Sequence, residues 1–272
     1  MSSLTEAKKL LQRYTLARIP FVSINTIERA RTLDILKEVA NDNGLLFLVH
    51  TLSKGIYDLV SNRTVSEDKS IYAAIDFVSD EMKRRENLTV IFTEVQDLTT
   101  DSTGTRQMLD LVTLANEHGG TIIVLTNNSI WGNLQRLGMT LKVDLPDESE
   151  MYEIIKEYID DYRSQINIEW DDNDIKEVAS TLTGVTKIEA ENVIAALIAN
   201  KEILKKDKED IAFAKDRLFS DISGLEKITV DENVKHVGGL SGLRKWLAEK
   251  KELLKPEKRE MLKAKGLQSP RG

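Results

Sequence analysis

Residues 19–32 read Ile19-Pro20-Phe21-Val22-Ser23-Ile24-Asn25-Thr26-Ile27-Glu28-Arg29-Ala30-Arg31-Thr32. The first part, residues 19–24, is a short apolar run of the kind that forms a buried strand. A helical pattern follows over residues 28–41, with apolar side chains on one face and Asn43-Gly44 as a stop signal. A buried strand that leads directly into an amphipathic helix predicts an α/β domain around these residues.

The same alternation extends to residue 147. Further apolar runs occupy residues 45–50, 88–92, 121–126 and, more briefly, 141–144. One-faced helical stripes lie between them, such as Ile71, Ile75, Val78 and Met82. Continuous apolar strands with intervening helices imply a parallel sheet that is covered on both faces. We therefore predict a five-stranded, P-loop-NTPase-like α/β core over residues 1–147.

The pattern becomes helical after Pro146. Helical stripes cover residues 149–163, 171–182 and 207–219. Thr186 and Glu189 have the spacing of a capping box at the start of another helix. We predict a helical lid bundle over residues 148–228, followed by a mainly helical extension over residues 229–272. Within this extension the sequence favours an extended stretch at 229–236 and helices at 240–254 and 256–266.

The composition describes a soluble, globular protein. Of the 272 residues, 41% are hydrophobic and 31% are charged. No apolar run approaches the roughly 20 residues that a membrane span needs, so we expect no membrane association. The chain has no cysteine, which excludes disulfides, thiolate metal sites and cysteine nucleophiles. These features favour a reducing compartment such as the cytoplasm or an organelle stroma.

Charge is distributed unevenly along the chain. Residues 148–230 carry 20 acidic and 11 basic side chains, whereas residues 231–272 carry 6 acidic and 11 basic ones. A basic tail on an acidic chain is one signature of nucleic-acid binding. The sequence favours a simpler interpretation, in which these lysines and arginines form the solvated faces of two short amphipathic helices.

The turn after the first strand lacks the features of a phosphate-binding loop. Residues 25–32 contain no glycine to let the backbone approach a phosphate and no lysine to meet it. No G-x-x-x-x-G-K-[ST] motif occurs anywhere in the sequence. Glu28 also places a negative charge where a phosphate would lie. We therefore predict no ATP and no magnesium ion at this turn, although the first backbone N–H groups of any helix attract anions.

One candidate catalytic residue follows the third strand, in Val90-Ile91-Phe92-Thr93-Glu94. A Walker B motif has two acids after such a run, the first for the magnesium shell and the second to polarise water. Thr93 replaces the first acid, and Glu94 stands at the place of the second. Glu94 and Asp97 can be interpreted as an acid pair for hydrolysis. The sequence favours strand-end carboxylates in a degenerate core instead, and it predicts no metal site.

Two further candidates would contact a nucleotide. Asn127 follows the fourth strand, where a polar residue of an ATPase senses the terminal phosphate. Asparagine is equally ordinary in a strand-end turn, and the sequence leaves both interpretations open. Arg136 lies before the fifth strand, in the region from which an arginine finger reaches the nucleotide of a neighbouring subunit. A solvated arginine at a helix end is the interpretation that the sequence favours for it.

Taken together, these features resemble a family of AAA+ ATPases. The family was first noted as a conserved hypothetical reading frame in algal plastid genomes and cyanobacteria, and joins a degenerate N-terminal AAA+ domain to an intact one. The resemblance rests on residues 19–30, 143–150, 182–192, 237–240, 243–247 and 266–272. The last of these, Gly266-Leu267-Gln268-Ser269-Pro270-Arg271-Gly272, is similar to the segment that leads into an AAA+ phosphate loop.

The resemblance implies a non-catalytic first half of an ATP-driven remodelling protein. Residues 229–272 would be a linker and the start of a second AAA+ domain, whose phosphate loop is not in this chain. ATP and magnesium are then expected only for the full-length family member, in the cytoplasm or the plastid stroma. The implied role is a scaffold that self-associates or packs on an AAA+ partner domain and positions an unidentified protein client. The alternative is a stand-alone module that binds protein or nucleic acid on a degenerate ATPase fold.

Overall fold

A computed structural model describes residues 3–93, 95, 98–223, 241–253, 258 and 261. The chain divides into two compact units, Met1–Ile222 and Ser223–Gly272. The first unit contains a seven-stranded sheet in the order β4-β3-β2-β5-β6-β1-β7. The strands are β1 (Phe21–Asn25), β2 (Phe47–Thr51), β3 (Gly55–Asp58), β4 (Thr64–Ser66), β5 (Thr89–Phe92), β6 (Thr121–Thr126) and β7 (Gly138–Lys142).

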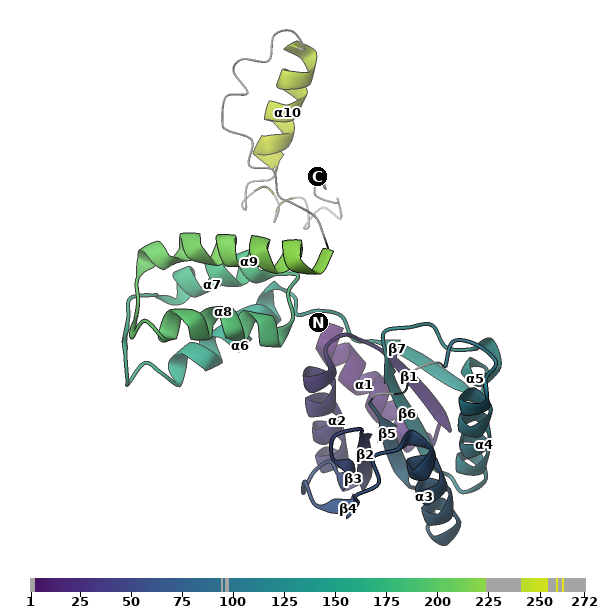
Figure 1. The fold of residues 1–272 in the computed structure, drawn as a ribbon. Coiled ribbons are helices and arrows are strands. Elements are labelled where there is room, and N and C mark those ends of the chain that lie inside the picture. The colour runs from purple at the N-terminus through teal and green to yellow at the C-terminus, as the bar shows by residue number, and fades with distance from the viewer. Residues whose placement is uncertain are drawn as a thin grey trace. The chain divides into compact units, whose positions relative to one another are not determined.

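Helices cover both faces of this sheet (Figure 1). They are α1 (Ser3–Leu16), α2 (Arg29–Asn43), α3 (Ile71–Arg84), α4 (Thr103–Glu117) and α5 (Gly132–Gln135). α1 and α2 lie on one face, while α3, α4 and α5 lie on the other (Figure 1). The prediction of a parallel sheet between two layers of helices is therefore confirmed.

The sheet has two strands more than the five predicted. The five predicted strands are β2, β5, β6, β1 and β7, and they run parallel to one another. The additional pair, β3 and β4, extends the sheet from β2 in an antiparallel sense. These strands contain only four and three residues, and much of β4 is exposed, so they carry too little apolar pattern to be recognised. Helix α1 was also missed, although Ala7 and Leu11 pack into the core.

The fifth predicted strand begins earlier than expected, at Gly138 and not at residue 141. Gly138 pairs with Phe21 of β1, and a Cβ atom at Gly138 would lie 1.8 Å from the Phe21 carbonyl oxygen. Only glycine permits such a close backbone approach. The remaining positions of β7 are mostly exposed, which is why the strand start has a weak apolar signal.

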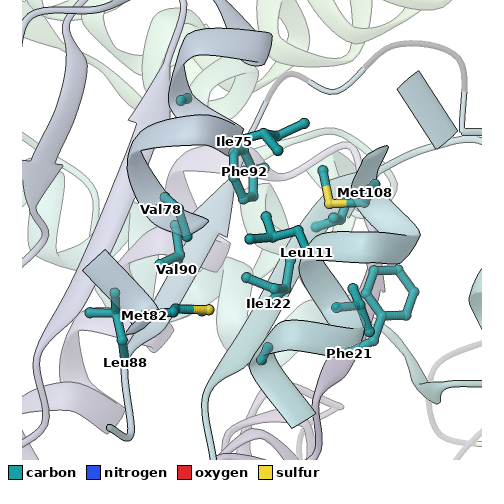
Figure 2. Packing of buried hydrophobic residues seen from close by; sticks show 14 of the residues in the cluster. Phe21, Ile75, Val78, Met82, Leu88, Val90, Phe92, Met108, Leu111 and Ile122 are labelled. Carbon is teal, nitrogen blue, oxygen red and sulfur yellow. The ribbon is translucent and has the colours of Figure 1, made fainter. Parts of the chain in front are cut away.

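Two hydrophobic clusters fill the spaces between the sheet and its helices. Figure 2 shows the cluster beneath α3 and α4, in which Val78 and Met82 of α3 and Leu111 of α4 pack on Val90 and Ile122 of the sheet. The second cluster joins α1 and α2 to the opposite face through side chains such as Leu11, Leu36, Val49 and Ile123. The strands are apolar on both faces because both faces are buried.

A helical bundle follows β7 and has its own hydrophobic cluster. Its helices are α6 (Glu148–Asp160), α7 (Asp172–Leu182), α8 (Lys187–Ile198) and α9 (Lys208–Ser223), with a short 3-10 turn at Lys205–Asp207. The two-residue strands β8 (Asn167–Ile168) and β9 (Glu202–Ile203) pair in parallel. The capping box predicted at Thr186 and Glu189 is present at the start of α8. The exact boundaries of core and bundle, at residues 147 and 228, stay predictions.

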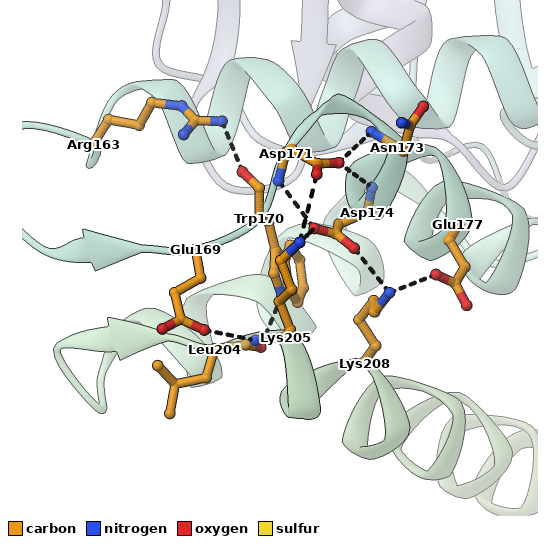
Figure 3. A network of polar contacts seen from close by, with 10 residues as sticks. All are labelled: Arg163, Glu169, Trp170, Asp171, Asn173, Asp174, Glu177, Leu204, Lys205 and Lys208. Atoms are coloured by element: carbon orange, nitrogen blue, oxygen red, sulfur yellow. Dashed lines mark hydrogen bonds and ion pairs between the residues drawn. The ribbon is translucent and has the colours of Figure 1, made fainter.

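A polar network holds the start of α7 to the segment before α9 (Figure 3). The Asp174 carboxylate accepts hydrogen bonds from Nζ of Lys208 at 2.9 Å and from the backbone N–H of Asp171 at 3.1 Å. Nζ of Lys205 lies 3.3 Å from the same carboxylate. Beside them the buried Trp170 ring donates its Nε1–H to the Leu204 carbonyl at 2.9 Å. These ion pairs and hydrogen bonds join the N-terminus of α7 to residues 204–208, beside the buried Trp170 ring.

The second unit contains α10 (Ser241–Leu253). This helix agrees with the one predicted over residues 240–254. Leu243, Trp246 and Leu247 are about half exposed in it. The extended stretch predicted at 229–236 lies outside the described residues, as does nearly all of the helix predicted at 256–266.

Candidate functional site

The turn between β1 and α2 occupies the place where a phosphate loop would lie. Only Thr26, Ile27 and Glu28 separate the strand from the helix. The Thr26 N–H donates to the Thr126 carbonyl of β6 at 2.9 Å, so the chain remains attached to the sheet beyond its strand. The Thr26 hydroxyl accepts the Glu28 N–H at 2.9 Å, and the Thr32 hydroxyl donates to the Glu28 carbonyl at 2.7 Å. The turn is therefore short and fixed by its own side chains.

The Glu28 carboxylate is buried and binds the start of a bundle helix. Glu28 is only 3% exposed, and its Oε1 accepts the backbone N–H of Lys187, the first residue of α8, at 2.7 Å. The first N–H groups of a helix lack partners within the helix and carry a partial positive charge. Burial raises the pKa of Glu28, whereas the hydrogen bond from Lys187 opposes that rise. Glu28 thus supplies a built-in anion to the α8 N-terminus.

Arg31 forms a second buried connection. Its Nη1 donates to the Asp144 carbonyl at 2.8 Å, and its Nη2 forms an ion pair with Glu150 in the first turn of α6. The Arg31 and Glu150 side chains are only 6% and 10% exposed. Glu150 also accepts the N–H groups of Leu4 and Asp147, each at 3.2 Å. One carboxylate therefore joins α1, α2 and α6.

We call Glu28, Arg31, Glu150 and the Lys187 N–H the core–bundle clasp. A cleft of about 620 Å³ lies beside it, lined by residues of α1, α2, α6 and the start of α8. Five carboxylates line this cleft, against three cationic side chains. The carboxylates are those of Asp34, Glu38, Glu150, Glu153 and Glu157, and the cations are Lys8, Arg31 and Lys187. The surroundings of the clasp are consequently more acidic than basic.

Of the sequence-predicted candidates, Asn127 and Arg136 lie in the part of the chain that the structure describes. Thr93, at the position of the metal-binding acid, is buried, and its hydroxyl donates to the His50 carbonyl of β2 at 3.1 Å. Asn127 is exposed directly after β6, and Arg136 is exposed at the end of α5. Glu94 and Asp97 lie outside the described residues. The roles suggested for Glu94, Asn127 and Arg136 stay predictions.

Sequence reasoning noted the charge of Glu28 but missed its partner, and it missed the pairing of Arg31 with Glu150. Asp147 and Glu150 form a capping box at the start of α6, and this Asp-x-x-Glu spacing was a usable signal for a helix start. Nothing in the spacing indicates that Glu150 also binds Arg31, which lies 119 residues earlier in the sequence.

The part of the chain that the structure describes offers neither a metal cluster nor a membrane-spanning helix. No group of three or more His, Asp or Glu side chains among these residues is placed to hold a metal ion. Among the helices that the structure describes, none is long and apolar enough to cross a membrane.

Comparison with known families assigns both parts of the first unit. The family described as "SpoVK-like AAA ATPase, N-terminal domain" matches residues 7–143. The chain belongs to the SpoVK-like AAA ATPases. A second model of this family, "SpoVK-like AAA ATPase, second domain", matches residues 149–221. The two matched regions correspond to the sheet domain and the helical bundle.

A curated relative matches most of the chain in a single alignment. The "Uncharacterized AAA domain-containing protein ycf46" of Trieres chinensis is 22% identical over 245 residues, which are 86% of this chain and 47% of that protein. The SpoVK-like chain thus spans about half the length of this relative. The resemblance to the plastid and cyanobacterial AAA+ family is confirmed.

Solved structures support the same fold. A chain from the "Structure of E. coli MS115-1 HORMA:CdnC:Trip13 complex" has a TM-score of 0.55 and 10% identity, covering 78% of this chain and 88% of that chain. The "Structure of C. elegans PCH-2" has a TM-score of 0.55 and 11% identity, covering 80% and 69%. At such low identity these similarities show the fold alone, and they agree with the predicted AAA+ fold class.

Proposed function

We propose that this chain is a non-catalytic AAA+ module that serves as a scaffold within an ATP-driven remodelling protein. The observation that carries the proposal is the buried Glu28 carboxylate, bound to the Lys187 N–H where a nucleotide phosphate would lie. ATP hydrolysis, with its magnesium ion, then falls to a separate AAA+ domain.

The residues of the turn do not fit a polyphosphate. A phosphate loop wraps its ligand with backbone N–H groups that glycine leaves accessible, and a lysine neutralises the charge. This turn has three residues, all with Cβ atoms, and two of its N–H groups, those of Thr26 and Glu28, bind the Thr126 carbonyl and the Thr26 hydroxyl. A phosphate would also meet the Glu28 carboxylate in a poorly solvated place, where like charges repel strongly.

A scaffold role also needs partners. One of the structures with a similar fold comes from a complex of HORMA, CdnC and Trip13 proteins. By analogy, we infer that this chain packs against copies of itself or against an AAA+ partner domain, and that it positions a protein client. Asn127 and Arg136 are exposed and stay candidates for contact with the nucleotide of a neighbouring subunit.

Isothermal titration of the chain with ATP and magnesium tests the proposal. We expect no saturable heat, while an AAA+ ATPase with an intact phosphate loop gives a binding isotherm in the same buffer. A saturable isotherm with a stoichiometry near one would contradict the proposal. In that case Glu94→Gln, titrated alongside Arg136→Ala, would show whether the degenerate Walker B position contributes to binding.

A further inference from the structure

We propose that the core–bundle clasp holds the helical bundle against the sheet domain in one fixed arrangement that needs no nucleotide. In this arrangement the Glu28 carboxylate does for the α8 N-terminus what an external anion would otherwise do. The inference rests on the proposed function in one respect: no nucleotide phosphate competes with the Glu28 carboxylate for the α8 N-terminus.

The first part of the argument is the hydrogen bonding at the start of α8. Thr186 and Glu189 satisfy each other: the Thr186 hydroxyl accepts the Glu189 N–H at 3.2 Å, and the Glu189 carboxylate accepts the Thr186 N–H at 2.7 Å. The Lys187 N–H lies outside this reciprocal pair. Its bond to Glu28 comes from a residue 159 positions earlier in the chain. The helix start is therefore completed only when the bundle lies against the turn.

The second part is the link between β7 and α6, which is attached to the sheet domain at two neighbouring positions. The Val143 N–H donates to the Asn25 carbonyl at 3.0 Å, and the Asp144 carbonyl accepts from Arg31 at 2.8 Å. Arg31 then continues to Glu150 in the first turn of α6. A hinge requires a few residues that are free to change their backbone angles. In this link the backbone groups of Val143 and Asp144 are both hydrogen-bonded to the sheet domain, which restricts such a change.

The third part is burial. A buried ion pair whose partners also satisfy backbone groups is costly to break, because either partner alone is an uncompensated charge. Opening the bundle would separate Arg31 from Glu150 and would leave the Glu28 carboxylate and the Lys187 N–H without each other. Glu28 immediately precedes α2 and binds α8, whereas Arg31 lies in the first turn of α2 and binds α6, so the bundle is held at two separate points.

The absence of cysteine from the chain allows a direct measurement. Asn116→Cys on α4 and Ser180→Cys on α7 are both at exposed helical positions and accept spin labels. Double electron–electron resonance then reports the distance distribution between the sheet domain and the bundle. The variants to compare are Glu28→Ala, Glu28→Gln and Arg31→Ala. Glu153→Ala is the matched control, because Glu153 lies on α6 and lines the same cleft without belonging to the clasp.

We expect one narrow distribution in the labelled parent, unchanged by ATP and magnesium. Glu28→Ala and Arg31→Ala should give distributions roughly twice as broad, with faster proteolysis in the link at residues 143–147. Glu28→Gln keeps an oxygen acceptor for the Lys187 N–H and should remain narrow, as should Glu153→Ala. Circular dichroism confirms that each variant is folded, and Glu28→Gln guards against a general loss of structure in Glu28→Ala.

Two results would overturn the clasp. One is a folded Glu28→Ala protein whose distribution and proteolysis match those of the parent. The other is a distribution in the parent that is already as broad as in Glu28→Ala. Saturable ATP binding by calorimetry, combined with a parent distribution that stays narrow and a broadened Glu28→Ala, would instead contradict the proposed function and leave the clasp supported.

Discussion

Replacing Glu150 with alanine should destabilise the first unit far more than a change elsewhere on the same helix. The Glu150 carboxylate pairs with the buried Arg31 guanidinium and accepts the backbone N–H groups of Leu4 and Asp147. Removing one partner of a buried ion pair costs about 3–5 kcal/mol. Arg31 retains its bond to the Asp144 carbonyl, which lowers the cost, whereas the lost capping-box acceptor adds about 1 kcal/mol. We expect a loss of about 3 kcal/mol.

The assay is urea unfolding followed by far-UV circular dichroism and by tryptophan fluorescence, to which Trp170, buried in the bundle, contributes beside Trp131 and Trp246. Glu150→Ala should move the midpoint to lower urea with little change in the slope. Glu153→Ala, at an exposed position on the same helix, should stay within about 0.5 kcal/mol of the parent.

A double-mutant cycle with Arg31→Ala isolates the pair. The double variant should lose at least about 1 kcal/mol less than the sum of the two single losses, because each single change leaves a buried charge unpaired. Equal losses for Glu150→Ala and Glu153→Ala, or strictly additive losses in the cycle, would refute the reasoning.

Three further predictions concern stability. Hydrogen bonding, chiefly from Lys208, lowers the pKa of Asp174 to about 2, so its contribution of about 1–2 kcal/mol is complete above about pH 4 and is lost as the pH falls toward 2; Asp174→Asn should flatten this acid limb in urea midpoints measured against pH. Burial raises the pKa of Glu28, so the parent should lose a little stability as the pH rises through that raised pKa, and Glu28→Gln should abolish this loss. Gly138→Ala should cost at least about 2 kcal/mol in the same assay, because its Cβ would meet the Phe21 carbonyl at 1.8 Å; Gly132→Ala, with nothing within 4 Å, is the control.

The sequence predicted best those elements that have a clear local hydrophobic pattern. Four of the five parallel strands, β1, β2, β5 and β6, could be predicted well because each is a continuous apolar run buried on both faces, whereas the mostly exposed β7 was recognised only in part. The hairpin of β3 and β4 could not be predicted, because strands of four and three residues are too short to show a clear period, and β4 is largely exposed. Helix α1 did offer a signal, since Ala7 and Leu11 are four residues apart, but the surrounding charges make the segment resemble a polar terminus.

The candidate site shows a different limit. The missing glycine and lysine and the misplaced charge of Glu28 are all visible in the sequence. The contacts of the clasp are not visible in the sequence. Lys187 lies 159 residues from Glu28, and Glu150 lies 119 residues from Arg31. Only the packing of the bundle on the sheet domain brings them together.

The amide signal of Lys187 offers the most direct test of the central claim, that a protein carboxylate occupies the place of a phosphate. In a proton–nitrogen correlation spectrum, the hydrogen bond to Glu28 should shift the Lys187 amide proton downfield. We predict that Glu28→Ala moves this signal upfield, and that ATP with magnesium leaves it unchanged in the parent. A Lys187 signal that moves on titration with ATP, or that is unaffected by Glu28→Ala, would contradict the account.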